Sequence, residues 1–172
     1  MSGPGANRPV IFLTIGSMFP FDRLVRAMDD WAGTVWQGEI LAQIGAGSYE
    51  PRHMRWVREL GFDDYNAAVS AADVIVAHAG MGSVITAGDK GKPIVLLPRR
   101  AAFDEHTNDH QIDTAAWLRT RPGIYVAETE RELGARVTEA LAAEAGAGAL
   151  DTAAPAEFLA RLRAFALTGR QG

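Results

Sequence analysis

The sequence of 172 residues contains no cysteine. It can therefore form neither a disulfide framework nor a thiolate metal site. It also has no uninterrupted run of 18 apolar residues, and its opening, MSGPGANRPV, carries no apolar stretch of signal-peptide length. These absences predict a soluble protein of a reducing compartment. We expect it in the cytoplasm, where any contact with the membrane is peripheral or made through a partner.

The chain also has no excess of positive charge. It has 17 Lys and Arg residues against 21 Asp and Glu residues, which gives a formal net charge of -4. A general nucleic-acid binder needs a basic face, so we expect no nucleic-acid partner. The remaining composition, 48% hydrophobic and 22% charged, is that of one globular domain with a substantial core.

Apolar runs that end in glycine or proline alternate with helical patterns along the chain. The runs typical of buried strands are PVIFLTIGS, EILAQIGAG, ADVIVAHAGMGS, PIVLLP and GIYVA, and the ambiguous HMRWVREL is interpreted as a strand. Helices are predicted over 21–31, 62–72, 83–90, 108–118 and 129–143. This alternation predicts an α/β fold with a Rossmann-like, doubly wound parallel sheet, which binds ligands beyond the carboxyl ends of its strands.

The expected domain covers residues 9–145. Residues 1–8 are rich in Gly and Pro and predict a disordered N-terminus. Within 146–172 an Ala- and Gly-rich linker is followed by AEFLARLRAFAL, whose apolar stripe is typical of an amphipathic helix. Such a stripe is buried either against its own domain or against a partner.

The junction HAGMGSVITAGDKGKP is a candidate anion site. Gly80 and Gly82 would let the backbone approach a ligand closely, and a helix that starts near Ser83 would offer unpaired amides to a phosphate. The alternative is that the glycines serve only a tight turn. His78 either orients this loop or is a structural histidine. The junction is not a P-loop, because proline follows Gly91-Lys92.

The stretch EHTNDHQ places His106 and His110 four residues apart, a spacing that can hold a metal on a helix. The zinc-protease pattern requires a glutamate directly after the first histidine, where this chain has Thr107, so we expect no metal. The amides and the acid of this stretch supply the hydrogen-bonding groups that sugar hydroxyls require. Asn108 or Asp109 is alternatively an N-cap of the helix that follows.

Taken together, HAGMGS, GKP and NDHQ, in this order and with the opening TIGS and QIGAGSYEP, resemble the C-terminal, donor-binding half of family 28 glycosyltransferases. The similarity covers roughly residues 9 to 142. Within this family, the sequence resembles the short stand-alone forms more closely than the two-domain enzymes. These forms are the soluble subunit of the dolichol-linked N-acetylglucosamine transferase and bacterial exopolysaccharide transferase subunits. The resemblance implies the GT-B fold, of which this chain would be the C-terminal half-domain, and a UDP-sugar bound at the carboxyl edge of the sheet.

The resemblance also implies the parts of the donor site. Gly16 and Ser17 match the first glycine loop, which faces the diphosphate. The loop and helix start that hold the phosphates match Gly80, Met81, Gly82 and Ser83. The segment that reaches the donor sugar matches Asn108, Asp109, His110 and Gln111. Phe62 matches the position of the uracil pocket. Many relatives grip the ribose with a glutamate where this chain has Thr86, so ribose recognition differs here or falls to Asp89 or a neighbouring residue.

Two further groups are candidates at this site. Arg99 and Arg100 follow the strand PIVLLP. They could contact the pyrophosphate or a uronate carboxylate of the donor through bidentate hydrogen bonds. The alternative is that both are solvated surface residues. Glu105 is expected at the donor site as well. If the chain itself supplies the catalytic base, the candidates are Asp104, Glu105, His106 and Asp109.

The function that the resemblance implies is that of a donor-binding subunit of an inverting glycosyltransferase, hexosyl- or glucuronosyl-transferring, in exopolysaccharide or glycolipid biosynthesis. A membrane-anchored subunit would supply the acceptor site and the base, and the acceptor would be a lipid-linked saccharide. No cofactor or metal is expected. The alternatives are a non-catalytic UDP-sugar-binding or scaffolding subunit and an enzyme like the nucleotide-sugar epimerases, which share this architecture.

Overall fold

The structure is a computed structural model that describes residues 8–143. The expected linker and amphipathic helix within 146–172, and all but the last of the eight N-terminal residues, lie outside the described residues. The strands are β1 (Val10–Thr14), β2 (Glu39–Gln43), β3 (Arg55–Val57), β4 (Val74–His78), β5 (Ile94–Leu97) and β6 (Ile124–Val126). The α-helices are α1 (Asp22–Val35), α2 (Phe62–Ala71), α3 (Met81–Asp89), α4 (His110–Leu118) and α5 (Leu133–Ala142).

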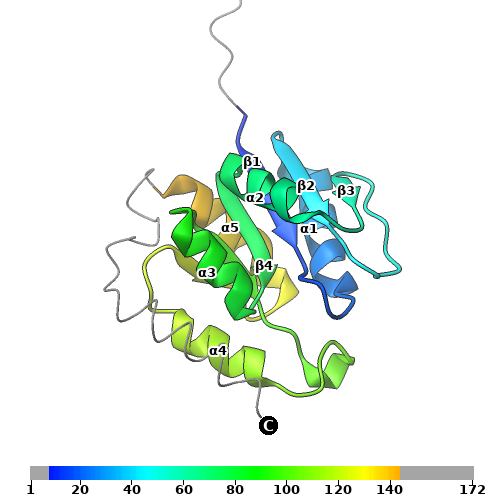
Figure 1. The fold of residues 1–172 in the computed structure, drawn as a ribbon, viewed down its shortest axis with the longest axis vertical. Helices are drawn as coiled ribbons and strands as arrows, with labels where there is room; N and C mark the ends of the chain where they lie inside the picture. Colours follow the sequence, from blue (N-terminus) through cyan, green and yellow to red (C-terminus); the bar gives the residue numbers. More distant parts are fainter. Residues whose placement is uncertain (1–7, 144–172) are drawn as a thin grey trace, which may run out of the picture.

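The six strands form one parallel sheet in the order β3-β2-β1-β4-β5-β6 (Figure 1). The prediction of a doubly wound parallel sheet is confirmed. The strand order reverses between β1 and β4, which pair directly from Ile11↔Val74 to Thr14↔Ala77. In sheets of this kind the crevice beyond such a switch point is where a ligand binds.

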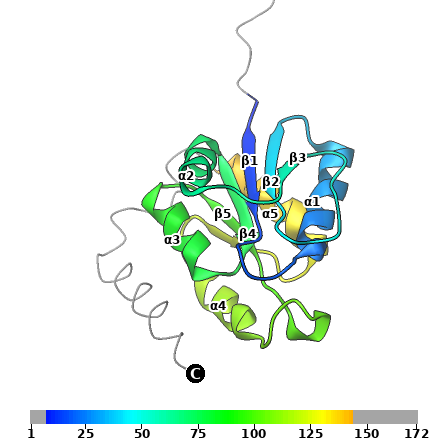
Figure 2. The same cartoon turned by 45° about the vertical axis from the view of Figure 1, so that its right-hand side comes forward.

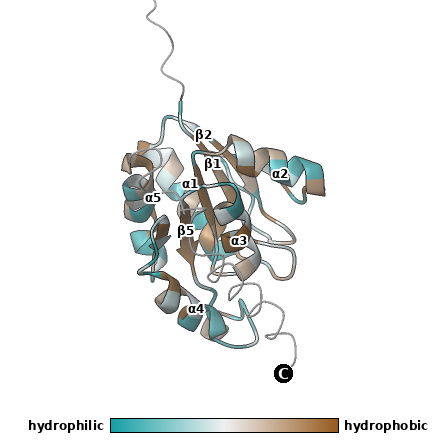
Figure 3. Ribbon diagram, turned by 60° about the vertical axis from the view of Figure 1, so that its left-hand side comes forward, coloured by the Kyte–Doolittle hydropathy of each residue, from teal (hydrophilic) through white to brown (hydrophobic). Residues whose placement is uncertain are grey.

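Helices cover both faces of the sheet. One core cluster joins inward residues of the strands to α1 and α5, and the other joins the opposite strand face to α2, α3 and α4. Apolar runs such as VIFLT are buried because each face of the strand packs against a helix layer. Figure 3 shows the strands in brown between helices whose outward sides are largely teal.

Element boundaries differ from the predictions at four helices. Helix α1 continues to Val35 and α3 begins at Met81, two residues before the expected Ser83, because Gly80 occupies the N-cap. Helix α4 begins at His110, and the segment expected as one helix from 129 to 143 opens with a 3₁₀ turn, η2 (Glu130–Glu132), before α5. The ambiguous segment HMRWVREL does contain a strand, β3.

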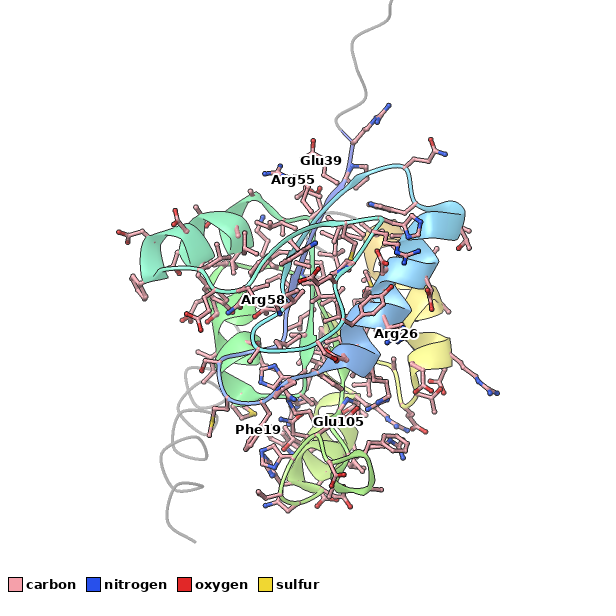
Figure 4. The ribbon with its side chains drawn as sticks, turned by 90° about the vertical axis from the view of Figure 1, so that its right-hand side faces the viewer. Phe19, Arg26, Glu39, Arg55, Arg58 and Glu105 are labelled. Carbon is pink, nitrogen blue, oxygen red and sulfur yellow. The ribbon has the colours of Figure 1, made fainter. Side chains whose placement is uncertain are left out.

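The carboxyl ends of β1, β4 and β5 meet at one edge of the sheet (Figure 2). Three connections leave the sheet there: the β1–α1 loop (residues 15–21), the β4–α3 turn (residues 79–80) and the β5–α4 loop (residues 98–109). In Figure 4, Phe19 and Glu105 lie at this edge, while Glu39 and Arg55, at the starts of β2 and β3, lie at the opposite end. A short 3₁₀ turn, η1 (Ala101–Phe103), lies within the β5–α4 loop.

Candidate functional site

The ring of His78 separates the two glycine loops at this edge. A Cβ atom built on Gly16 would lie 2.7 Å from Cε1 of His78, and one built on Gly80 would overlap Nε2 of the same ring. Gly16 also has a φ of +77°, in the left-handed region that favours glycine. Both positions therefore need glycine in order to leave room for the imidazole.

His78 is a neutral ring at neutral pH. The pKa of His78 is lowered to about 4, mainly by burial and also by the nearby charges of Arg99 and His106, while a hydrogen bond with the backbone of Thr14 offsets part of this shift. An uncharged imidazole held between two loops fits the expectation of a residue that orients the glycine loop.

The start of helix α3 is open to a ligand. The first turn contains no acidic side chain, and a Cβ atom built on Gly82 would meet no atom within 4 Å. The amides of the first turn have no partner within the helix, and the helix dipole adds partial positive charge at this end. Gly82 thus leaves space beside the amides of the helix start, and the predicted anion site at this junction stays a prediction.

Ser83 does not lie at the very start of the helix, where the sequence predicted it. Gly80 holds the N-cap position, and Ser83 lies inside the first turn with only 7% of its surface exposed. Its hydroxyl takes part in a hydrogen bond with the phenol of Tyr65, which also bonds to Thr14. Burial raises the pKa of Tyr65, and these two hydrogen bonds offset part of the rise.

Sequence reasoning missed this hydroxyl cluster beneath the glycine loops. Thr14 donates to Oε1 of Gln43 at 2.6 Å, and both side chains are buried at the carboxyl ends of β1 and β2. Each is a polar residue that directly follows an apolar run at the carboxyl end of its strand, and that pattern was visible in FLTIGS and LAQIG. Tyr65, inside α2, gave no comparable signal.

Arg99 is neither a solvated surface residue nor free to contact the pyrophosphate as expected, because the protein itself engages its guanidinium. The residue is 2% exposed, and its guanidinium donates to backbone carbonyl groups. The acceptors are the oxygens of Ile15, Phe19 and Pro20, each at 2.7 Å, and of Glu105 at 3.3 Å. Arg100 turns away as well, because its side chain donates to the carbonyl of Glu128.

Glu105 is engaged in an ion pair, which corrects its assignment to the donor site and as a candidate base. Its carboxylate accepts hydrogen bonds from Nε and Nη2 of Arg23, at 2.7 and 2.8 Å. It also accepts one from the backbone N–H of Arg100 at 2.9 Å. Arg23 bonds to Glu130 too, so this network joins α1 to the β5–α4 loop and to η2.

The remaining residues of EHTNDHQ split into an exposed group and a buried residue. The ring of His106 lies between those of Phe19 and His110, with centroids 5.4 and 4.4 Å away. Asn108 accepts a hydrogen bond from the backbone N–H of His110 at 3.2 Å, and its Oδ1 also contacts the His110 ring, while the N-cap position of α4 is held by Asp109. Burial, with the charges of His110 and Arg99, lowers the pKa of His106.

Gln111 and Asp109 are held by the protein itself. Gln111 is 4% exposed and its Oε1 accepts from the backbone N–H of Arg99 at 3.1 Å, which corrects the expectation that it reaches the sugar. Asp109 is exposed, but its Oδ1 accepts from the backbone N–H of Ala101 at 2.8 Å. Thr107, Asn108 and His110 are exposed and His106 is half-buried, and the hydrogen bonds that these side chains form are exposed as well.

Phe62 and Thr86 lie on the helices beside the site. Phe62 is 83% exposed at the first position of α2, which leaves its ring available for stacking. Thr86 donates to the carbonyl of Gly82 within α3 at 2.9 Å. Its hydroxyl therefore does not replace the glutamate that binds the ribose at this position in many relatives.

Within residues 8–143, no group of three or more His, Asp or Glu side chains is arranged to hold a metal ion. In the same range, no helix is long and apolar enough to cross a membrane.

The fold and the open helix start together define a Rossmann-like domain of the GT-B type. The chain belongs to the family described as "Glycosyltransferase family 28 C-terminal domain", which it matches over residues 10–154. The match includes all three connections at the carboxyl edge.

Named relatives support this assignment. Over 98 residues the chain is 32% identical to a UDP-N-acetylglucosamine–N-acetylmuramyl-(pentapeptide) pyrophosphoryl-undecaprenol N-acetylglucosamine transferase of Nitratidesulfovibrio vulgaris, an alignment of 52% of this chain and 26% of that protein. Among solved structures, MurG of Acinetobacter baumannii aligns with a TM-score of 0.57 and 21% identity, over 78% of this chain and 42% of that one. The glycosyltransferase of kitacinnamycin aligns with a TM-score of 0.61 and 19% identity, over 98% and 41%.

The chain spans only about a quarter of the length of the curated relative and about two fifths of these solved structures. The likeness to the solved structures, below 25% identity, shows the fold alone.

Proposed function

We propose that this chain binds a UDP-sugar at the carboxyl edge of its sheet and is the donor-binding half of an inverting glycosyltransferase. The acceptor would be a lipid-linked saccharide of exopolysaccharide or glycolipid biosynthesis. The curated relative is named for transfer from a UDP-sugar to a pyrophosphoryl-undecaprenol acceptor, which is the chemistry proposed here in outline. The solved glycosyltransferase VinC, named as a complex with dTDP, has the same fold, with a TM-score of 0.56 and 19% identity over 96% of this chain.

The observation that carries the proposal is the open start of α3. Gly80 brings the chain into the helix in an extended conformation, and Gly82 has no atom within 4 Å of its Cβ position. A diphosphate placed there would receive hydrogen bonds from helix-start amides and lie at the positive end of the dipole. Gly16 and Ser17 would face the same group from the β1–α1 loop.

The two ends of the donor would lie on opposite sides of the diphosphate. The exposed ring of Phe62 would stack on the base, and His110 would contact the sugar, with Asn108 and Asp109 beside it. Because Thr86 is bonded within its own helix, we propose that the ribose is held by another group near the end of α3.

The chemistry would be displacement at the anomeric carbon with UDP as leaving group. Loop amides and the α3 dipole would stabilise the charge that develops on the diphosphate, so the reaction would need no metal. Glu105 is engaged with Arg23, and Asp109 with the backbone of Ala101. We therefore place the catalytic base in a partner, with Asp104 and His106 as the remaining in-chain candidates.

Calorimetry tests the donor site. The full chain should bind UDP and a subset of UDP-sugars with equal affinity in buffer with EDTA and in buffer with Mg²⁺. A panel of UDP-glucose, UDP-N-acetylglucosamine and UDP-glucuronate would identify the sugar. If no nucleotide in the panel binds, the proposed function is wrong. If binding depends strictly on Mg²⁺ or Mn²⁺, the metal-free mechanism is wrong.

A second candidate function is a UDP-sugar-binding subunit without activity of its own. It is favoured by the engagement of Glu105 and Asp109, which leaves the described residues with few groups that could act as a base. We propose that activity requires a membrane-anchored subunit that also recruits this chain to the inner face of the membrane. Transfer to a lipid-linked acceptor should be measured with the pure chain and with the product of the neighbouring gene. Robust transfer by the chain alone would exclude this candidate.

A further inference from the structure

Arg99 connects the two loops that the donor would touch. From the end of β5, one of its terminal nitrogens, Nη2, donates to the carbonyls of Ile15 and Phe19. The other, Nη1, donates to Pro20 in the β1–α1 loop and to Glu105 in the β5–α4 loop. One buried side chain thus fixes three carbonyls of the first loop and one of the second.

The surroundings of Arg99 hold the guanidinium in a single place. Its Cζ lies 4.6 Å from the centre of the Phe21 ring, which is itself 1% exposed. The backbone N–H of Arg99 donates to Oε1 of Gln111, the second residue of α4. Side chain and backbone therefore reach the β1–α1 loop, the β5–α4 loop and the start of α4.

We propose that Arg99 is a positioning residue that sets the place of the β1–α1 loop relative to the segment 105–111, and thereby the geometry of the donor site. This inference rests on the proposed function, because these two loops would contact the diphosphate and the sugar. The side chain acts through backbone carbonyls and not through contact with the donor.

The chemistry of arginine suits this role better than that of lysine. A planar guanidinium offers five N–H groups in fixed directions, whereas an ammonium group on a flexible chain has three. Carbonyls from two loops can be held at the same time only by the planar group. Burial lowers the pKa of Arg99 to about 10, with Glu105 offsetting part of the shift, so all of its donors are present at neutral pH.

The first arm of the test is hydrogen exchange on the full chain without ligand. In Arg99→Met, the hydrogen-bonded amides of residues 15–20 and 105–109 should exchange at least about tenfold faster than in the wild-type protein, while the amides of β4 keep their rates. These amides are those of Ile15, Gly16, Glu105, Thr107 and Asn108. A role in overall stability would raise the rates in β4 as well. Faster exchange in β4, or in only one of the two loops, would overturn the proposal.

The second arm is binding. At a temperature where circular dichroism shows both proteins folded, Arg99→Met should bind UDP at least about tenfold more weakly. Arg99→Lys, which keeps the charge, should recover only part of the loss and carries the test if the methionine variant does not fold. The matched control is Arg136→Met, because Arg136 forms an ion pair with Glu139 on α5 and should leave UDP affinity unchanged.

The two arms separate this inference from the proposed function. If the wild-type chain binds UDP and Arg99→Met binds it equally well, Arg99 does not position the donor site and the inference is wrong. If the wild-type chain binds no nucleotide, the proposed function is wrong, and the exchange rates still decide whether Arg99 fixes the two loops relative to each other.

Discussion

The imidazole of His78 occupies the space beside Gly16, where a Cβ atom would lie 2.7 Å from Cε1 of the ring. Because Gly16 also has a φ of +77°, an alanine there would combine backbone strain with displacement of the ring. We expect Gly16→Ala to lower the free energy of unfolding by about 1–3 kcal/mol. Urea denaturation measures this.

The matched control for Gly16→Ala is Gly82→Ala. Gly82 is helical, and its Cβ position is open, so alanine there should be neutral or stabilise the protein by about 0.5–1 kcal/mol. Equal losses in the two variants would mean that neither the positive φ nor the His78 ring constrains Gly16.

The low pKa of His78 predicts how stability depends on pH. Its pKa is about 4 in the folded protein against the ordinary histidine value of 6.5, so the unfolded chain binds more protons between these values. Stability should be complete above about pH 6.5 and decline by roughly 1–3 kcal/mol as the pH falls to about 4. His106, whose pKa is also lowered, contributes with the same sign.

Denaturation at a series of pH values tests this assignment. His78→Gln should reduce the slope of unfolding free energy against pH in the window between about 4 and 6.5. The part of the slope that comes from His106 should remain. Because the slopes are compared, a general loss of stability in the variant does not affect the result. An unchanged slope would show that His78 titrates normally in the folded protein.

Gly82→Val tests the anion site at the start of α3. The valine side chain would extend into the open space beside the helix-start amides and block a phosphate, without touching any protein atom at its Cβ. UDP binding should fall at least about a hundredfold, since several charge-assisted hydrogen bonds are lost together. Thermal unfolding should show a melting temperature close to that of the wild type.

Gly61→Val is the control for this substitution. A Cβ atom at Gly61 also meets nothing within 4 Å, and the residue precedes α2 in the way that Gly80 precedes α3. UDP affinity in this variant should stay within about threefold of the wild type. If the control and Gly82→Val lose affinity equally, the helix start of α3 is not the phosphate site.

His110 and Gln111 are neighbours in sequence, but their substitution should have different effects. His110→Ala should weaken binding of a UDP-sugar by about tenfold more than binding of UDP, because the exposed ring would face the sugar. Gln111→Ala should instead lower stability by about 1–2 kcal/mol, since it removes the acceptor of the buried Arg99 N–H. Calorimetry and urea denaturation of both variants distinguish the two roles.

The buried strands and the glycine junctions that follow them could be predicted from the sequence because they depend on local patterns. Apolar runs such as VIFLT and IVLL have few alternatives to buried parallel strands, and the glycines that follow them mark the carboxyl edge. The family resemblance then predicted which edge residues to expect at the site.

The directions of charged side chains could not be predicted, because they depend on contacts between distant segments. Arg99 and Arg100 are adjacent and chemically identical, yet one bonds to carbonyls about 80 residues earlier in the chain and the other to Glu128. In the same way, Glu105 is removed from the candidate bases by Arg23, 82 residues away. Such pairings appear only when α1 and the β5–α4 loop are brought together.

Arg23 allows a matched comparison of two carboxylates. Its guanidinium bonds to Glu105, whose side chain is 9% exposed, and to Glu130, whose side chain is 45% exposed. Glu105→Gln leaves Arg23 and the Arg100 N–H without their anionic acceptor in a buried site, and should cost about 3–5 kcal/mol of unfolding free energy. Glu130→Gln removes a solvent-screened partner and should cost at most about 1 kcal/mol.

Urea denaturation of the two variants measures both losses, and each should be compared with UDP binding at a temperature where the variant is folded. A structural Glu105 predicts a large loss of stability, with the fold and the site failing together as denaturant is added. A catalytic Glu105 predicts the reverse, because a base that is not needed for folding can be replaced by glutamine without loss of stability. If Glu105→Gln is as stable as Glu130→Gln and only sugar transfer is lost, Glu105 is the base and the ion pair with Arg23 serves to hold it ionised.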